Sequence, residues 1–245
     1  IESNSFRFWW YGTDKKAYTN ADGLFRKVDD YYIYNSNENY AVYDESTGSF
    51  KVYDGTYEQK SRDAGGEQAS QTNGKAIGFF PFHPWDDEYD LFVNWNKNLN
   101  HHFGMSMSVD FALPPAPKAV KDTKGNDIVF HFSGDDDMWV FIDGKLAMDI
   151  GGIHQPTSGT INFTKKEVSV TVGEPGQEYD QYQNFDFDSL YDGQKHTLQL
   201  FYIERGGCDS NCLIQFNMTR YEDVVFETVD ADDQTKLIEG ATFGL

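Results

Sequence analysis

The sequence predicts an all-β protein, an antiparallel β-sandwich with long loops and few short helices. Aromatic residues make up 16% of the 245 residues, and aromatic side chains favour the pleated, half-buried surface of strands. Short apolar or alternating stretches recur between turn-forming dipeptides such as Asp54-Gly55 and Asp143-Gly144. No helical period of 3.6 residues persists along the chain.

Strands are expected at short intervals from the N-terminus onward. In the first 75 residues, polar turns separate four of them, at residues 6–11, 31–34, 40–43 and 49–53. The small, polar stretch 61–74 predicts an exposed loop. An apolar run at residues 76–80 ends at Pro81, and strands are then expected at residues 102–111, 128–132, 138–142, 160–163, 167–172, 196–203 and 213–219. Many short strands at this spacing favour a sandwich.

The composition changes near residue 222, which predicts a domain boundary there. Residues 1–222 form the sandwich domain, and residues 223–245 are expected to be the first strands of a second, truncated domain. Because the chain begins with Ile1, we expect a mature fragment of a longer protein. No apolar run approaches the ~20 residues that a membrane-spanning helix needs, so membrane insertion of this fragment is not expected.

The net charge of the chain excludes some classes of binding partner. Lys and Arg total 20 against 40 Asp and Glu, which gives a net charge of −20. Such a chain is repelled by nucleic acids and by anionic membrane surfaces. The acidity is compatible with binding a cation, although most of it is expected to be solvated surface.

An acidic motif directly precedes one of the strongest predicted strands. Gly134 is followed by Asp135, Asp136 and Asp137, and then by the apolar stretch 138–142. Carboxylate oxygens are the ligands that a hard cation such as Ca²⁺ prefers. The motif is therefore either part of a calcium site or a solvated acidic turn.

A second polar loop lies between two predicted strands. Cys208 and Cys212 have a C-x-x-x-C spacing, which predicts a disulfide and thus an oxidising compartment. The alternative is two independent buried thiols. Asp209, Ser210 and Asn211 lie between the cysteines and offer oxygen ligands. This loop is either a recognition site or a stapled hairpin end.

No enzyme is predicted. The sequence contains no G-x-S-x-G elbow, no H-E-x-x-H motif and no Walker loop. Gly151 and Gly152, which follow a predicted strand, indicate a bend or a close backbone approach. His154 is expected to be a structural hydrogen-bonding group rather than a catalyst.

The residues of the acidic motif resemble a known family. The stretch 133–146, SGDDDMWVFIDGKL, followed by DIGGIH at 149–154, resembles the fibro-slime subgroup of the anthrax-protective-antigen-like domains. Shorter matches lie at 79–81, 100–103, 204–205 and 210–214. The resemblance implies a protective-antigen-like β-sandwich. In lectin-type relatives two consecutive Asp residues bind Ca²⁺, which also holds sugar hydroxyls. The residues that match this pair are Asp135 and Asp136.

The C-terminal stretch has a resemblance of its own. Residues 229–232 and 238–245 resemble the start of a collagen-adhesin B-type (SpaA-like) domain, which forms stalks of Gram-positive surface proteins. Thr228 stands where such domains usually have the Lys of an internal isopeptide bond. The resemblance implies that stalk domains follow this one in the same chain.

Together the two resemblances imply an extracellular, cell-wall-anchored bacterial adhesin head. It would bind a cell-surface glycan or glycoprotein through Ca²⁺. The expected metal ligands are Asp135, Asp136, Asp209 and Asn211. The expected ligand-binding residues are Asp135, Asp136, Arg205, Ser210 and Asn211. The alternative is a structural or protein-binding surface or pilus module in which any calcium is only structural.

Overall fold

The computed structural model describes a large part of the chain. The described residues are 5–10, 17–18, 22–54, 78–82, 85–86, 91–92, 103–115, 120–152, 154, 156–172, 176–204 and 210–219. Among these ranges, only the backbone is described for 5–10, 17–18, 85–86 and 91–92. The predicted second domain at 223–245, the boundary near 222 and the predicted loop at 61–74 lie outside the described residues.

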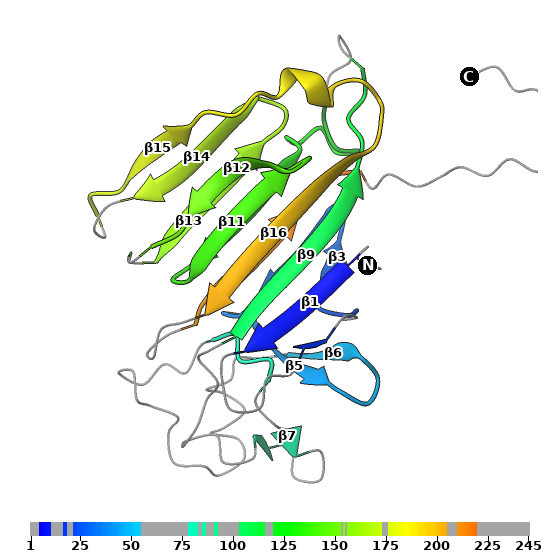
Figure 1. The fold of residues 1–245 in the computed structure, drawn as a ribbon, viewed down its shortest axis with the longest axis vertical. Helices are drawn as coiled ribbons and strands as arrows, with labels where there is room; N and C mark the ends of the chain where they lie inside the picture. The colour runs from blue at the N-terminus through cyan, green and yellow to red at the C-terminus, as the bar shows by residue number, and fades with distance from the viewer. Residues whose placement is uncertain are drawn as a thin grey trace, which may run out of the picture.

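Two antiparallel sheets make up the described fold (Figure 1). The six-stranded sheet has the order β12 (Lys145–Ile150), β11 (Asp137–Ile142), β16 (His196–Glu204), β9 (Phe103–Phe111), β1 (Ser5–Trp10) and β2 (Ala17–Tyr18). The seven-stranded sheet has the order β15 (Tyr179–Gln183), β14 (Glu167–Val172), β13 (Thr157–Asn162), β10 (Val129–Gly134), β17 (Cys212–Phe216), β4 (Tyr31–Asn35) and β3 (Arg26–Val28). The predicted all-β sandwich is therefore confirmed.

Smaller elements accompany the two sheets. β5 (Asn39–Asp44) and β6 (Ser49–Asp54) form a hairpin, β7 (Trp85–Asp86) pairs with β8 (Leu91–Phe92), and one short 3₁₀ helix, η1, covers Asp188–Leu190. The described residues include no helix that could span a membrane. β1 and β4 join different sheets, so the N-terminal region supplies strands to both layers.

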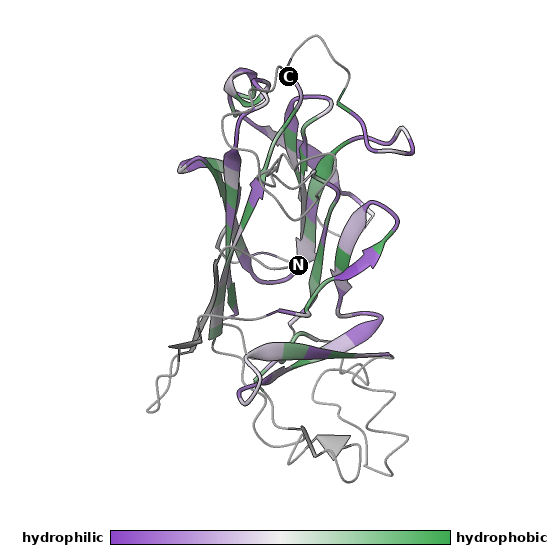
Figure 2. Cartoon of the chain, turned by 90° about the vertical axis from the view of Figure 1, so that its right-hand side faces the viewer, coloured by the Kyte–Doolittle hydropathy of each residue, from purple (hydrophilic) through white to green (hydrophobic). Residues whose placement is uncertain are grey.

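Alternating side chains build the core between the sheets. Every second residue of β16 is buried, from His196 to Glu204, and β10, β11 and β17 alternate in the same way. Alternating residues of β9 are almost fully buried: Phe103, Met105, Met107 and Val109. Each such side chain contributes about 1.5–3 kcal/mol through burial. Figure 2 shows the two sheets from the side as separate layers.

The β11–β12 hairpin turns where the sequence predicts it. Asp143 and Gly144 have φ angles of 49° and 74°, as a two-residue hairpin turn requires. Asp143 N donates to Thr197 O at 3.0 Å, and Thr197 N donates to Asp143 Oδ1 at 2.9 Å. These bonds attach the turn to the start of β16.

The apolar run 76–80 does not extend either sheet at its described residues. Of the apolar run 76–80, residues 78–80 are described, and Gly78 makes only an isolated bridge with Ser210. Phe79 N donates to Ser210 O at 2.5 Å. The segment therefore contacts the residues before β17 without extending either sheet. Its apolar character reflects burial of Phe79 and Phe80 rather than strand pairing.

Candidate functional site

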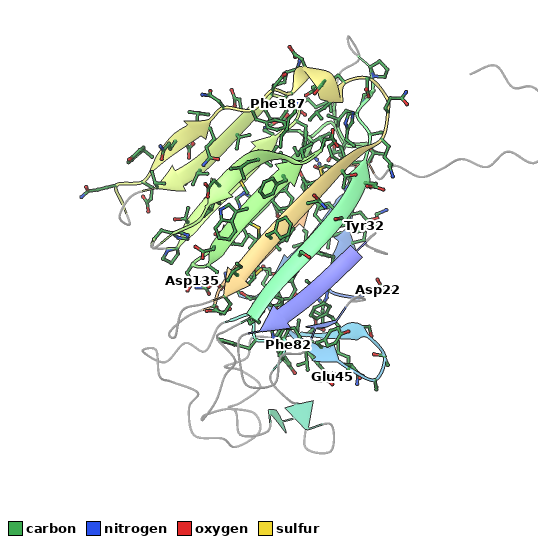
Figure 3. The ribbon with its side chains drawn as sticks, viewed as in Figure 1. Asp22, Tyr32, Glu45, Phe82, Asp135 and Phe187 are labelled. Atoms are coloured by element: carbon green, nitrogen blue, oxygen red, sulfur yellow. The ribbon has the colours of Figure 1, made fainter. Side chains whose placement is uncertain are left out.

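The acidic motif lies at the turn between β10 and β11, at one end of the sandwich (Figure 3). Gly134 ends β10, and Asp137 begins β11. Asp136 is only 5% exposed and Asp137 only 3% exposed, whereas Asp135 is half-buried. The solvated-turn alternative is therefore wrong for Asp136 and Asp137, because the bend carries both side chains into the protein.

Asp135 contacts the second polar loop directly. Its Oδ1 accepts a hydrogen bond from Asn211 N at 2.6 Å. A Cβ on Gly134 would lie 2.4 Å from Asn211 O, so only glycine permits this approach. The structure thus brings two predicted site residues, Asp135 and Asn211, together across the β10–β17 pair.

Asp136 is linked to the same loop through a tyrosine. Tyr202 OH donates to Asp136 Oδ2 and lies 3.3 Å from Ser210 Oγ. Ser210 Oγ in turn donates to Phe79 O at 2.9 Å. All four residues are buried. Ser210 is therefore fixed inside the protein as an internal connector.

Glu204 places a second buried carboxyl group beside Asp136. Its side chain is 0% exposed at the end of β16. Burial first, and then the charge of Glu204, raise the pKa of Asp136 to about 10, although the bond from Tyr202 acts in the opposite direction. Asp135 adds to the increase. In the absence of a cation, Asp136 therefore keeps its proton at neutral pH.

Sequence reasoning did not assign a site role to Glu204 or Tyr202. The signal was the period of two in β16, because residues 198, 200 and 202 are apolar or aromatic and point inward. Extending that alternation by one step puts Glu204 inside as well. Its proximity to Asp136 follows from strand order, since β11 pairs with β16 and Asp137 lies opposite Ile203.

Asp137 and the glycine segment have structural partners. Asp137 Oδ1 accepts a hydrogen bond from Gly152 N at 2.7 Å. A Cβ on Gly151 would lie 2.5 Å from the Trp139 ring, which confirms the predicted close approach. His154 Nε2 lies 3.3 Å from Ile150 O, a structural contact of the kind expected for this histidine.

The predicted disulfide is not present at Cys212. This cysteine is a buried free thiol, and burial raises its pKa well above the usual value. As the first residue of β17 it points into the core, and its N–H donates to Ser36 Oγ at 2.9 Å. Three other predicted residues lie outside the described ranges: Arg205, Cys208 and Asp209.

Those predicted calcium ligands that are described do not form a ready-made metal site. Within the described part of the chain, no group of three or more His, Cys, Asp or Glu side chains is arranged to hold a metal ion. Asp135 contacts the backbone of Asn211, and Asp136 contacts Tyr202. The donor chemistry suits a hard cation, but both carboxyl groups already use an oxygen in a hydrogen bond within the protein.

Comparisons with known proteins give partial matches. No family model matches the chain, and no solved structure matches it. The chain is similar to protein psiP of Dictyostelium discoideum, with 39% identity over 125 residues, 51% of this chain and 12% of psiP. It is similar to protein psiF of the same organism, with 39% identity over 137 residues, 54% of this chain and 16% of psiF. Protein psiE is 30% identical over 148 residues, 58% of this chain and 23% of psiE.

These relatives overturn the predicted source and location. They are proteins of a eukaryote, so the prediction of a bacterial adhesin head anchored to a cell wall is wrong. The calcium-held glycan site assigned to that adhesin also lacks its metal cluster among the described residues. Most of the motif at 133–154 forms β11, the hairpin turn and β12, whose inward side chains are buried, and such packing requirements do not depend on the organism. The chain spans less than a quarter of these three relatives.

Proposed function

We propose that the chain carries a non-catalytic binding module of a longer protein. The proposed ligand site is the acidic end, defined here as the half-buried Asp135 and Asn211 and the buried Asp136, Glu204 and Ser210 beneath them. The observation that supports this proposal is the buried Asp136–Glu204 pair, in which burial and the neighbouring carboxyl raise the pKa of Asp136 to about 10.

Burying Asp136 beside Glu204 lowers the stability of the fold, which indicates a role beyond packing. Neighbouring buried carboxyl groups cannot both ionise without a compensating charge. Apolar side chains of similar size would fill the same space without this cost. Groups with strongly shifted pKa values concentrate at functional sites, and among the described residues Asp136 has a raised carboxyl pKa of this kind.

The rest of the acidic end is suited to recognition. Asp135 and Asn211 are half-buried and therefore reach the surface, while the residues beneath them are fixed by hydrogen bonds. A polar rim held by a rigid scaffold is the usual form of a binding loop. The glycoprotein partner expected from the sequence stays a prediction.

Calcium also stays a prediction from the sequence. Carboxylate, hydroxyl and carbonyl oxygens match the ligand preference of Ca²⁺, and the acidic end supplies all three. The proton on Asp136 and the hydrogen bond from Tyr202 would have to be given up first. Binding of Ca²⁺ should therefore be stronger at higher pH.

The first test is the thermal stability of the 245-residue chain in EDTA, in Ca²⁺ and in Mg²⁺ at pH 7.5. An ion at about 100 times its Kd adds roughly 2.7 kcal/mol. We expect stabilisation by Ca²⁺ over Mg²⁺, and its loss in Asp136→Asn. The matched control is Asp54→Asn, which makes the same change at an exposed carboxylate paired with Arg26.

Two results would overturn the proposal. If neither ion stabilises the wild type, and stability in EDTA follows only the protonation of Asp136, the pair is a structural feature. If Asp54→Asn loses the response as fully as Asp136→Asn does, the ion acts on the surface charge of the whole chain and not on the acidic end.

A further inference from the structure

We infer that β15 is a dimer interface, at which its outer edge pairs antiparallel with β15 of a second copy of this chain. β15 is the last strand of the seven-stranded sheet, and β14 is its partner there. Figure 1 shows it at the outer margin of the described fold. The inference concerns a surface away from the acidic end and does not depend on the proposed binding site.

The edge is regular and preformed. β15 pairs with β14 over five consecutive residues, from Val172 opposite Tyr179 to Val168 opposite Gln183, without a bulge. Gln183 attaches the strand to the other sheet: its Nε2 donates to Asp149 O at 2.8 Å, and its Oε1 accepts from Asp149 N at 2.9 Å. A partner strand would therefore meet a backbone that is already extended and fixed.

Exposed aromatic side chains lie along this edge. Tyr179 is 63% exposed and Tyr182 is 66% exposed, which makes them the two most exposed large hydrophobic residues among those described. The strand contains neither lysine nor proline. Its single charge, on Asp180, accepts a hydrogen bond from Thr171 Oγ1 at 2.7 Å, and this bond directs the carboxylate towards β14.

The other edges of the two large sheets carry the protection that natural sheets use against pairing. β12 is capped at Asp149 by the Gln183 amide. β3 has only three residues, which include Arg26 and Lys27, and β2 has only two. β15 differs from all three because it is longer than β3 and β2 and has no cap of this kind described on its outer side.

A second copy fits this edge by its side chains. In an antiparallel pair with its two-fold axis at Gln181, Gln181 faces Gln181 of the second copy. Asp180 then faces Tyr182 of the second copy, an uncharged residue. No two like charges are opposed. Pairing of this type uses the same patch on both copies and closes at two.

The net charge of −20 on each copy limits the strength of this dimer. At physiological ionic strength, charges more than about 8 Å apart are largely screened, so the repulsion weakens the pairing without preventing it. The dimer should therefore be concentration-dependent and should dissociate more readily at low salt.

Sedimentation equilibrium of the 245-residue chain, from about 10 to 500 µM, tests the inference. We expect a monomer–dimer equilibrium for the wild type. Gln181→Lys should raise the dissociation constant at least tenfold, because it opposes two ammonium groups at the axis. Gln177→Lys is the matched control, since it adds the same charge to an exposed residue just before β15 and should leave the constant within twofold.

Mixing two variants with opposite charges at residue 181 tests whether β15 pairs with β15 of a second copy. Gln181→Lys and Gln181→Glu should each be monomeric, and their equimolar mixture should regain the dimer. Thermal melts of each variant check that the monomer is folded. A wild type that stays monomeric at every concentration, a dimer that Gln181→Lys leaves unchanged, or an open series of higher oligomers would each overturn the inference.

Discussion

The two ends of the β11–β16 pair differ in the partners that they give to carboxyl groups. At the acidic end, the start of β11 and the end of β16 place Asp136 beside Glu204. At the other end, buried His196 lies between two carboxylates: Nδ1 is 2.7 Å from Asp143 Oδ2, and Nε2 is 3.1 Å from Asp192 Oδ1. The same two strands thus carry an acid–acid pair and an acid–histidine–acid bridge.

The difference shows what the fold requires and what it does not. At the histidine end, the carboxylates also accept backbone bonds, from Thr197 N to Asp143 and from Gln194 N to Asp192. The bond from Gln194 N is the main cause that lowers the pKa of Asp192. At this end the carboxylates of Asp143 and Asp192 have hydrogen-bond donors as partners, so the β11–β16 pair does not by itself force a carboxyl group to lie beside another one. The Asp136–Glu204 arrangement is therefore a specific feature of the acidic end.

The largest expected effect is the pH dependence of stability in EDTA. The folded pKa of Asp136, about 10, lies above the unfolded value of 3.8. The stabilising contribution of the protonated group is therefore complete below pH 3.8 and is lost as pH rises towards 10. The slope is at most about 1.4 kcal/mol per pH unit, or about 4 kcal/mol between pH 5 and pH 8.

Urea denaturation of wild type and Asp136→Asn at pH 5, 6.5 and 8 measures this effect. The variant should lack the slope and exceed the wild type in stability at pH 8. A wild-type curve that is flat over this range, or as steep in the variant, would show that Asp136 does not hold its proton. Excess Ca²⁺ should reduce the slope if the ion replaces that proton.

Removing the histidine bridge should destabilise the protein, whereas Asp136→Asn should stabilise it at pH 8. His196→Ala leaves Asp143 and Asp192 without their shared partner and removes a ring 5.8 Å from the Phe111 centroid. We expect a loss of about 2–3 kcal/mol in the free energy of unfolding at pH 7. His131→Ala is the matched control, because the His131 ring is half-buried with one polar contact described, at 2.8 Å from Thr160 Oγ1. An equal loss in both variants would contradict a special role for the bridge.

The smallest effect concerns the close approach at the acidic end. Gly134→Ala would place its Cβ 2.4 Å from Asn211 O, and we expect a loss of about 1–2 kcal/mol because a backbone atom must move. Gly176→Ala meets no atom within 4 Å and carries only the strain of a φ of +85°, so it should cost less. Calorimetric melts compare the two. If Gly176→Ala costs more, the contact between the turn and Asn211 is loose.

The sequence predicted only part of the acidic end and did not predict β15. The acidic motif and the residues at 210–211 were predicted as separate loops, and a resemblance was needed to join them. β15 was not predicted, because its sequence YDQYQ is polar and exposed on both faces and lacks the apolar alternation on which strand prediction depends. The predicted disulfide was wrong because the spacing of Cys208 and Cys212 does not reveal that Cys212 begins a strand and points into the core.

The sequence by itself determined the β class, the alternation that places Phe103, Met105, Met107 and Val109 on one face of β9, and the hairpin turn at Asp143. These are local properties: a period of two specifies which side chains share a face, and a dipeptide specifies a turn. Only the tertiary structure decided that Glu204 lies beside Asp136, that β1 and β4 serve different sheets and that β15 ends one of them. The physical reason is that alternation fixes the face of a strand but not its neighbours, which are chosen by packing between residues far apart in the chain.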